Sequence, residues 1–224
     1  MAGQIYLWQN TFFQIKTVTG LVEANRYFIV HKPYNMVSQF VSPHNVNLLG
    51  DINFHFPEGT HAIGRLDNQS EGLLILTTNK KVTKLLFEGN VPHKRTYLVQ
   101  VRDVVTPEKL LMLQAGVNIQ IKGGVNYQTP PCDVTIVERP TNLFTRPDLY
   151  FEKQAHTWLQ ITLTEGKYHQ VRKMVDAVRH RCKRLIRISI EDILLENLPP
   201  GEVREMEETA FFDQLKIYDW RSEL

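Results

Sequence analysis

Short apolar stretches alternate with polar, turn-forming segments along most of this chain. Six of the stretches are rich in leucine, isoleucine, valine and aromatic residues, and most are bounded by turn-forming residues, a pattern typical of strands. A further segment, 117–127, predicts a hairpin around Lys122-Gly123-Gly124. The six predicted strands are 26–31, 71–78, 97–101, 134–138, 158–164 and 184–190.

Apolar residues recur at helical spacing in three other segments, 79–88, 106–116 and 168–180. The middle one begins with Thr106-Pro107-Glu108, which supplies a capping hydroxyl, a first-turn proline and an acid. The predicted apolar face of the third segment consists of Val171, Met174, Val175 and Val178.

The predicted strands outnumber the predicted helices and cluster in hairpin-like pairs. The regular alternation of strand and helix that marks a doubly wound parallel sheet is missing. No internal repeat, low-complexity stretch or strong linker divides the chain. We therefore expect one α+β domain. A weakly patterned leader precedes it at 1–24, and an acidic tail at 206–224 has aromatic residues that predict a short docking helix.

The composition is ordinary for a globular protein, with 42% hydrophobic and 22% charged residues. The sequence has no apolar run long enough to span a membrane, and its start lacks the features of a secretory signal. The two cysteines, Cys132 and Cys182, do not have zinc-site spacing. We therefore expect a cytoplasmic protein with free thiols and no metal site.

Basic residues gather in one part of the chain. The overall net charge is only +2, but residues 165–187 contain eight Lys or Arg against two acids. Such a block can hold phosphates and release counterions, which favours a nucleic acid partner. A solvated helix face is the alternative interpretation. The eight residues are Lys167, Arg172, Lys173, Arg179, Arg181, Lys183, Arg184 and Arg187.

Asp67 lies in a polar loop that leads directly into the apolar stretch 71–78. Gly64 and Gly72 bracket this loop. A loop carboxylate that is held by a rigid sheet is well placed for catalysis. By composition alone, however, an aspartate between glycines is more often a turn residue. The loop by itself therefore does not identify a function.

Two further segments combine an apolar pattern with polar residues. One is His93-Lys94-Arg95-Thr96-Tyr97, which opens a predicted strand, although a lone strand tyrosine usually belongs to the core. The other is 165–175, Glu-Gly-Lys-Tyr-His-Gln-Val-Arg-Lys-Met-Val, in which His169 and Arg172 lie at the edge of the apolar helix face. Neither segment is specific alone.

Taken in order, these three segments resemble the motifs of the pseudouridine synthases that modify ribosomal RNA. They are similar to that family's aspartate motif, its lysine-x-tyrosine strand motif and its Glu-Gly-x-x-x-Gln-Val-Arg-x-Met motif. The resemblance covers roughly 27–205. Within the family, the segments 31–40 and 157–163 are similar to the large-subunit synthase E branch. The three motifs are specific only in combination.

The resemblance implies an α+β pseudouridine synthase fold, with a long, largely antiparallel mixed sheet, flanking helices and a central cleft. It implies a catalytic domain at 25–205 between the leader and the tail. The implied activity is that of an isomerase that converts a uridine of large-subunit ribosomal RNA to pseudouridine without a cofactor. We expect a monomer. The leader is too short for the S4-type RNA-binding module of many relatives, so the catalytic domain itself is expected to grip RNA.

The resemblance also implies roles for three residues. Asp67 is expected to be the catalytic carboxylate, Arg172 the cation that holds it anionic through a salt bridge, and Tyr97 the ring that stacks on the target uracil. RNA contacts are expected from residues in or near the same motifs, namely Arg65, Arg95, Lys167, His169, Gln170, Lys173, Arg179 and Arg181.

Two positions depart from the family pattern. Arg95 stands where the family often has lysine, which keeps the charge but changes the hydrogen-bonding geometry. Arg179-His180-Arg181 follows the predicted arginine-bearing helix at a place where the family usually has glycine. We expect this loop to contact RNA in its own way.

Two other functions remain open at this level. Asp67 and Glu71 could form the acid and nucleophile of a glycosidase, although Glu71 opens a strand and no sugar-binding aromatic platform is evident. Alternatively, the chain is a non-catalytic RNA-binding or ribosome-assembly module in which Asp67 only closes a turn. Asp67→Asn separates the binding module from a synthase, because a binding module tolerates the change whereas a synthase loses turnover.

Overall fold

The computed structural model of the protein describes residues 24–88, 91–146 and 154–221. No helix among these residues is long and apolar enough to cross a membrane. The helices are α1 (Val82–Phe87), α2 (Pro107–Ala115), α3 (Gln170–Ala177) and α4 (Glu208–Gln214), with single 3-10 turns at Leu49–Asp51 and Lys122–Gly124. The strands are β1 (Tyr27–Lys32), β2 (His61–Ile63), β3 (Glu71–Thr77), β4 (Arg95–Arg102), β5 (Asn118–Gln120), β6 (Asn126–Gln128), β7 (Asp133–Val137), β8 (His156–Leu163), β9 (Cys182–Ile190), β10 (Ile193–Leu194) and β11 (Val203–Met206).

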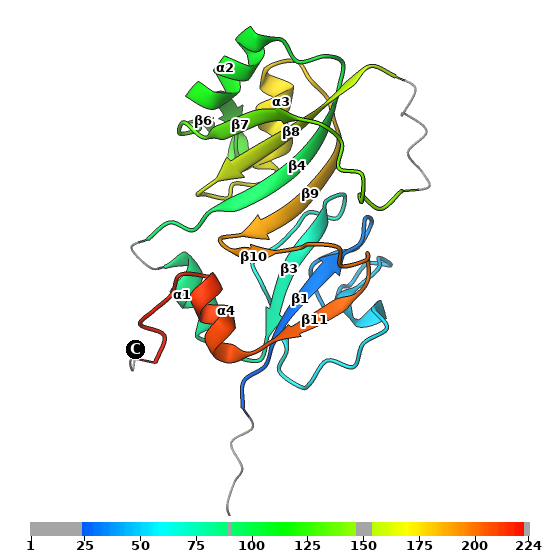
Figure 1. Ribbon diagram of the computed structural model, residues 1–224, viewed down its shortest axis with the longest axis vertical. Helices are drawn as coiled ribbons and strands as arrows, with labels where there is room; N and C mark the ends of the chain where they lie inside the picture. The colour runs from blue at the N-terminus through cyan, green and yellow to red at the C-terminus, as the bar shows by residue number, and fades with distance from the viewer. Residues whose placement is uncertain (1–23, 89–90, 147–153, 222–224) are drawn as a thin grey trace, which may run out of the picture.

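Nine of the strands form one curved mixed sheet that consists of two antiparallel halves (Figure 1). One half has the order β9-β4-β8-β7, with β10 also beside β9, and the other has the order β11-β1-β3, with β2 also beside β3. The halves meet where β3 runs parallel to β9 over only two residue pairs, Glu71 with Ile186 and Gly72 with Arg187. The expected α+β fold with a largely antiparallel mixed sheet is confirmed.

Gly72 makes the close approach of the two half-sheets possible. Its φ is +103°, and a Cβ at this position would lie 2.3 Å from the carbonyl oxygen of Arg187. Both the backbone conformation and the lack of space require glycine. Beside it, the buried Arg184 guanidinium donates two hydrogen bonds of 2.9 and 2.8 Å to the buried Glu71 carboxylate. A glycine and a buried ion pair therefore define the joint between the half-sheets.

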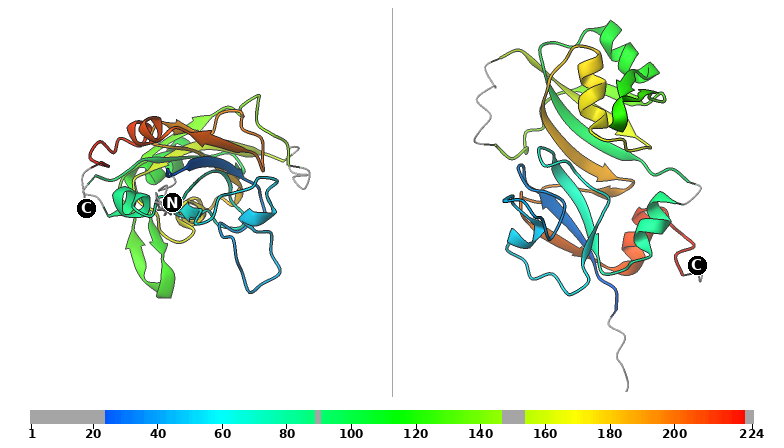
Figure 2. Two further views of the ribbon diagram at one scale, coloured as in Figure 1. Left: turned by 90° about the horizontal axis from the view of Figure 1, so that it is seen from below. Right: turned by 180° about the vertical axis from the view of Figure 1, so that it is seen from behind.

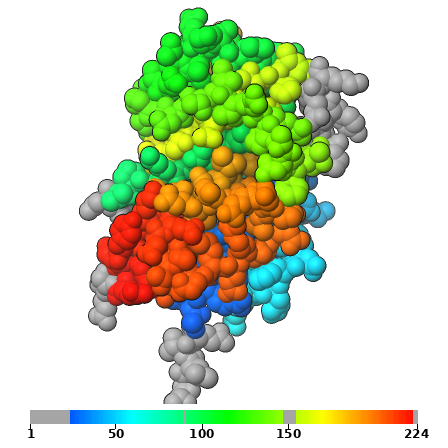
Figure 3. Space-filling model, in the orientation of Figure 1, coloured from blue at the N-terminus to red at the C-terminus, as the bar shows by residue number. Residues whose placement is uncertain are grey.

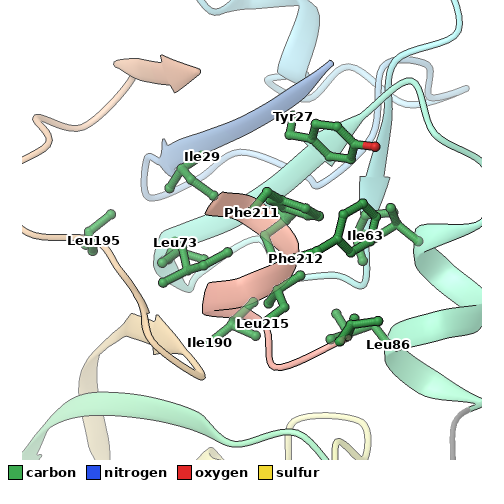
Figure 4. Packing of buried hydrophobic residues seen from close by; sticks show 14 of the residues in the cluster. Tyr27, Ile29, Ile63, Leu73, Leu86, Ile190, Leu195, Phe211, Phe212 and Leu215 are labelled. Carbon is green, nitrogen blue, oxygen red and sulfur yellow. The ribbon is translucent and has the colours of Figure 1, made fainter. Parts of the chain in front are cut away.

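In the half-sheet β11-β1-β3, which is the lower one in Figure 1, side chains alternate between two apolar clusters, as the two-residue period of a strand requires. Phe28, Val30 and their neighbours on β3 pack against residues of the segment 36–56. Tyr27 and Ile29 point to the opposite face, where they pack with α1 and α4. Figure 4 shows this second cluster gathered around α4, whose Phe211 ring centroid lies 4.4 Å from that of Tyr27.

The two faces of the sheet have different coverings. The chain from β10 onward, coloured orange to red, covers much of the lower part of the face seen in Figure 3. Helix α3 and the loops of residues 37–60 lie together on the opposite face, as the view from behind shows (Figure 2). Val171, Met174 and Val175 of α3 pack against the other half-sheet, β9-β4-β8-β7. The loop before β3 and helix α3 thus approach each other on one face, near the joint.

The structure differs from the predicted elements mainly at their ends. Helix α3 is shorter than the predicted 168–180, because His169 and Arg179 both have positive φ values, +55° and +63°. Strands β2 and β11 were not predicted because they are short and partly polar. Cys132 and Cys182 are free thiols, as expected. The expected leader, 1–24, lies outside the described residues apart from its last position.

Candidate active site

Asp67 lies on the loop 64–70, which leads from β2 into β3 at the joint of the half-sheets. The hydroxyl of Ser38 accepts a 3.0 Å hydrogen bond from the Leu66 N–H and donates one of 2.9 Å to the Leu66 carbonyl oxygen. The N–H of Ser70 donates to the carbonyl oxygen of Asp67 at 2.9 Å and closes a turn. The backbone on both sides of Asp67 is therefore fixed.

Lys32 lies beneath this loop and is fully buried. Its ammonium group donates hydrogen bonds of 2.8 and 2.7 Å to the carbonyl oxygens of Pro33 and Met36, and it lies 3.5 Å from the carbonyl oxygen of Asn68. Burial lowers the pKa of Lys32 to about 7, and nearby carboxylates oppose the shift only in part. A buried amine thus supports the backbone next to Asp67.

Arg172, from the first turn of α3, holds the same loop from the other side. Its Nη2 donates a 2.7 Å hydrogen bond to the carbonyl oxygen of Gln69 and one of 3.2 Å to the Ser70 hydroxyl. Its Nη1 lies 3.6 Å from the Sγ atom of Cys182. The expected salt bridge is wrong for this state of the protein: within the described ranges, the Arg172 guanidinium has no carboxylate partner. It binds the loop that carries Asp67.

His169 makes the contact that was expected from Arg172. Its Nε2 lies 3.4 Å from Oδ1 of Asp67, and the two side chains are 37% and 29% exposed. His169 adopts the left-handed conformation immediately before α3. Its ring stacks on Tyr168 with a centroid separation of 3.9 Å. The carboxylate thus has one imidazole partner while remaining open to solvent.

A cleft of about 790 Å³ brings the three expected catalytic residues together. Asp67 comes from the loop before β3, Tyr97 from the beginning of β4, and Arg172 from α3, so all three elements near the joint contribute to its wall. Four of the residues expected to bind RNA line the same cleft, namely Arg65, Lys167, His169 and Gln170.

The amide group of Gln170 is engaged on both of its atoms. Its Oε1 accepts a 2.8 Å hydrogen bond from the N–H of Lys167, and its Nε2 donates one of 2.6 Å to Glu165. The Tyr127 hydroxyl donates to the other oxygen of Glu165 at 2.5 Å. Gln170 therefore shapes the turn that presents Lys167 and His169 to the cleft.

The remaining expected RNA-binding residues lie elsewhere. Arg95 is buried, with its guanidinium 5.1 Å from the centroid of the Phe87 ring, and it does not line the cleft. Lys173 and Arg181 line a second recess beside the cleft. Arg179 lines neither cavity. These four residues therefore lie at several different places on the protein, and that they contact RNA stays a prediction.

Glu71 is not available as the second carboxylate of a glycosidase. Its side chain is 3% exposed and is held by Arg184 and by Arg146, the latter at 3.2 Å. It does not line the cleft. A carboxylate that is buried between two guanidinium groups and lies outside the cleft cannot reach a leaving group there.

Sequence reasoning missed several residues that build the site. Ser38 and Lys32 hold the Asp67 loop, and Glu165 anchors the turn before α3. The run His31-Lys32-Pro33-Tyr34 carried the only available signal, because a lysine within an otherwise apolar strand requires a buried partner. That run had served only as a mark of resemblance.

Comparison with known proteins identifies what this arrangement is similar to. Residues 26–177 match the family model described as RNA pseudouridylate synthase. The ribosomal large subunit pseudouridine synthase E of Vibrio parahaemolyticus is 33% identical over 83% of this chain and 76% of its own length. The synthase of the same name from Xanthomonas axonopodis is 33% identical over 77% of this chain and 89% of its own length.

The solved structures agree with the sequence relatives. A crystal structure of a pseudouridylate synthase superposes with a TM-score of 0.69 at 25% identity, covering 87% of this chain and 75% of that one. The human RNA pseudouridylate synthase domain containing 1 superposes with a TM-score of 0.52 at 13% identity, which supports the fold alone.

Proposed function

Because this chain belongs to the RNA pseudouridylate synthase family, we propose that its cleft isomerises a uridine of large-subunit ribosomal RNA, with Asp67 as the catalytic carboxylate. The chain is an RNA-modifying isomerase of this family. The choice of large-subunit RNA is supported by the names of the relatives from Vibrio and Xanthomonas. The role of Asp67 is supported by its place, since it shares one cleft with Tyr97 and Arg172.

The reaction breaks the bond between carbon and nitrogen that joins uracil to ribose and forms a carbon–carbon bond to the same ribose. It needs a carboxylate that acts as a nucleophile or stabilises a cationic sugar, and it needs no redox step. Asp67 suits this task because its backbone is fixed while its carboxylate remains 29% exposed in the cleft. A fixed position lowers the entropic part of the barrier.

Arg172 and Tyr97 are proposed to serve the same step in different ways. Arg172 sets the position of Asp67 by binding Gln69 and Ser70. Tyr97 presents its ring to the cleft, where stacking on a uracil is worth about 1–3 kcal/mol. Its hydroxyl is the proposed acceptor of the proton from carbon five of the rearranged base.

The RNA must give up a base to this cleft. Extruding a uridine from a helix costs roughly a few kcal/mol, which stacking and phosphate contacts offset. Arg65 and Lys167 lie in the cleft wall and are the proposed first contacts of the nucleotide. That the protein is a monomer stays a prediction. A ribosomal RNA substrate supports the proposed cytoplasmic location.

The decisive test compares Asp67→Asn with a matched control. Asp103 is another solvent-exposed loop aspartate, and its φ of +67° is one that asparagine tolerates well. Pseudouridine formation is measured on a transcript of large-subunit ribosomal RNA, together with RNA binding and the unfolding transition. We expect Asp67→Asn to fold and bind RNA but to form no pseudouridine, and Asp103→Asn to be fully active. Full activity of Asp67→Asn would refute the proposal.

The substrate is tested separately, in cells. Pseudouridines are mapped in ribosomal RNA from cells with and without this protein. We expect one large-subunit position to lose its modification and to regain it when the wild-type gene, but not the Asp67→Asn gene, is restored. An unchanged large-subunit map with a changed map elsewhere would overturn the ribosomal substrate and keep the enzyme assignment.

A further inference from the structure

A second recess of about 240 Å³ adjoins the cleft. This recess, called the basic recess below, is large enough for about eight water molecules. Two of its residues, His169 and Arg172, also line the cleft, so the two cavities share a wall. Its remaining residues are Lys173, Asp176, Arg181 and Cys182. A ligand that extends from the cleft past Arg172 therefore enters the basic recess.

The positive charges of the basic recess are not neutralised by carboxylates. Arg172 donates to a carbonyl oxygen and a hydroxyl, and the Lys173 ammonium donates to the carbonyl oxygen of Gln120 at 2.6 Å. The exposed Arg181 side chain forms no ion pair within the part of the chain that the structure describes. Three cations thus face one acid, Asp176, which also has no ion-pair partner among the described residues.

We propose that the basic recess binds a phosphodiester group of the RNA strand that delivers the uridine to the cleft, with Arg181 as its main donor. This proposal rests on the function proposed above. A guanidinium offers a planar fork of donors that matches the oxygens of a phosphate, and such charge-assisted bonds are stronger than neutral ones. Arg181 is the one cation of the recess without a hydrogen bond from its side chain to another described residue.

The shared wall explains why a phosphate belongs there. A uridine in the cleft remains attached to its neighbours through the backbone, so the strand must leave the cleft along a path that is open and not negatively charged. The basic recess meets both conditions. Arg181 is a positioning residue, since it lies outside the cleft that holds Asp67 and does not touch the reacting atoms.

Arg102 provides a matched control on the neighbouring strand. It is an exposed arginine whose backbone N–H donates to the carbonyl oxygen of Arg181, and it lines neither the cleft nor the basic recess. Arg181→Gln and Arg102→Gln each remove one positive charge. A general electrostatic attraction predicts equal losses of RNA affinity for the two variants, whereas a phosphate contact in the recess predicts a loss for Arg181→Gln alone.

Binding of the full chain to a fluorescein-labelled single-stranded oligouridylate is measured by anisotropy over a series of salt concentrations. We expect Arg181→Gln to weaken binding about tenfold at low salt and to reduce the slope of log affinity against log salt by about 0.7, the value for one phosphate of a single strand. Arg181→Lys should restore the slope, because it restores the charge. Arg102→Gln should match the wild type. Equal slopes for wild type and Arg181→Gln, or equal losses in the two charge-removing variants, would overturn the proposal.

Turnover separates this proposal from the proposed function. On large-subunit ribosomal RNA transcripts, Arg181→Gln should raise KM about tenfold and leave kcat unchanged. A wild-type protein that forms no pseudouridine would contradict the proposed function. The salt dependence of oligouridylate binding would still test whether the basic recess binds a phosphate. Inorganic phosphate at constant ionic strength distinguishes a strand site from a free-anion site. Tight phosphate binding that depends on Arg181, with RNA binding that does not, would also overturn the proposal.

Discussion

Nε2 of His169 lies 3.4 Å from Oδ1 of Asp67, and no other basic side chain among the described residues pairs with this carboxylate. The contact comes from a residue with a φ of +55°, a conformation that costs a residue other than glycine roughly 1–2 kcal/mol. The backbone before α3 is thus held so that the imidazole reaches the carboxylate. Asp67 is oriented by His169, while Arg172 orients the loop beneath it.

Removing this imidazole should lower turnover more than binding. Asparagine tolerates a positive φ but its amide is too short to reach Asp67, so His169→Asn removes the contact and keeps the backbone. We expect kcat to fall about tenfold with KM nearly unchanged, because a tenfold loss corresponds to about 1.4 kcal/mol of transition-state stabilisation. Steady-state kinetics on ribosomal RNA transcripts measure this. A change in KM alone would show that His169 contacts RNA and does not orient Asp67.

The buried ion pair between Glu71 and Arg184, at the joint of the half-sheets, should contribute strongly to the free energy of unfolding. Glu71→Gln leaves the Arg184 guanidinium buried without a counter-charge, which costs roughly 3–5 kcal/mol. Urea unfolding should show a correspondingly lower free energy of unfolding. The double variant Glu71→Leu with Arg184→Met removes both charges and should recover most of the loss. If Glu71→Gln alone is as stable as the wild type, the pair does not hold the joint.

The buried Lys32 predicts how stability depends on pH. Burial lowers its pKa from an unfolded value of 10.5 to about 7, so between these values the unfolded chain binds more protons than the folded one. The free energy of unfolding therefore rises with pH, and the contribution of Lys32 is about 2 kcal/mol between pH 7 and pH 9. Lys32→Met should flatten this rise, whereas Lys80→Met, at an exposed position, should leave it intact. Parallel curves for Lys32→Met and the wild type would contradict the shifted pKa.

Arg179 occupies a position that favours glycine. After α3, the N–H of Arg179 bonds to the Asp176 carbonyl oxygen and that of His180 to Val175, which together form a Schellman cap. The residue at this position of the cap takes positive φ, here +63°. Arg179→Gly should therefore raise the free energy of unfolding by about 1 kcal/mol. Thermal unfolding measures this, and a lower melting temperature would show that the arginine side chain stabilises the fold.

The elements with the strongest apolar pattern could be predicted from the sequence. The predicted strand 71–78 and the observed β3 differ by one residue, because every side chain of β3 is buried and the pattern is unambiguous. The helix at 168–180 was predicted too long at both ends. The positive φ values that end it belong to His169 and Arg179, and neither residue type signals such a conformation.

The site could be predicted only in part. Asp67, Tyr97 and Arg172 were brought together by family resemblance, since nothing in their spacing places them in one cleft. The expected salt bridge failed because the carbonyl oxygen of Gln69 and the hydroxyl of Ser70 take the donors of Arg172. Where a backbone carbonyl points depends on the folded loop, and a sequence does not state it. The same holds for the basic recess, whose residues are spread over 169–182 and meet only in the fold.

The two residue pairs that join β3 to β9 determine when the catalytic site is assembled during folding. Each antiparallel half closes its own hydrogen-bond ladder, and among the described strands the two halves pair with each other only between β3 and β9. The loop that bears Asp67 belongs to one half, and Tyr97 and Arg172 belong to the other. A chain with all of its strands formed but the halves still apart has native secondary structure and no catalytic site. Regain of activity on refolding therefore reports that the two halves have docked.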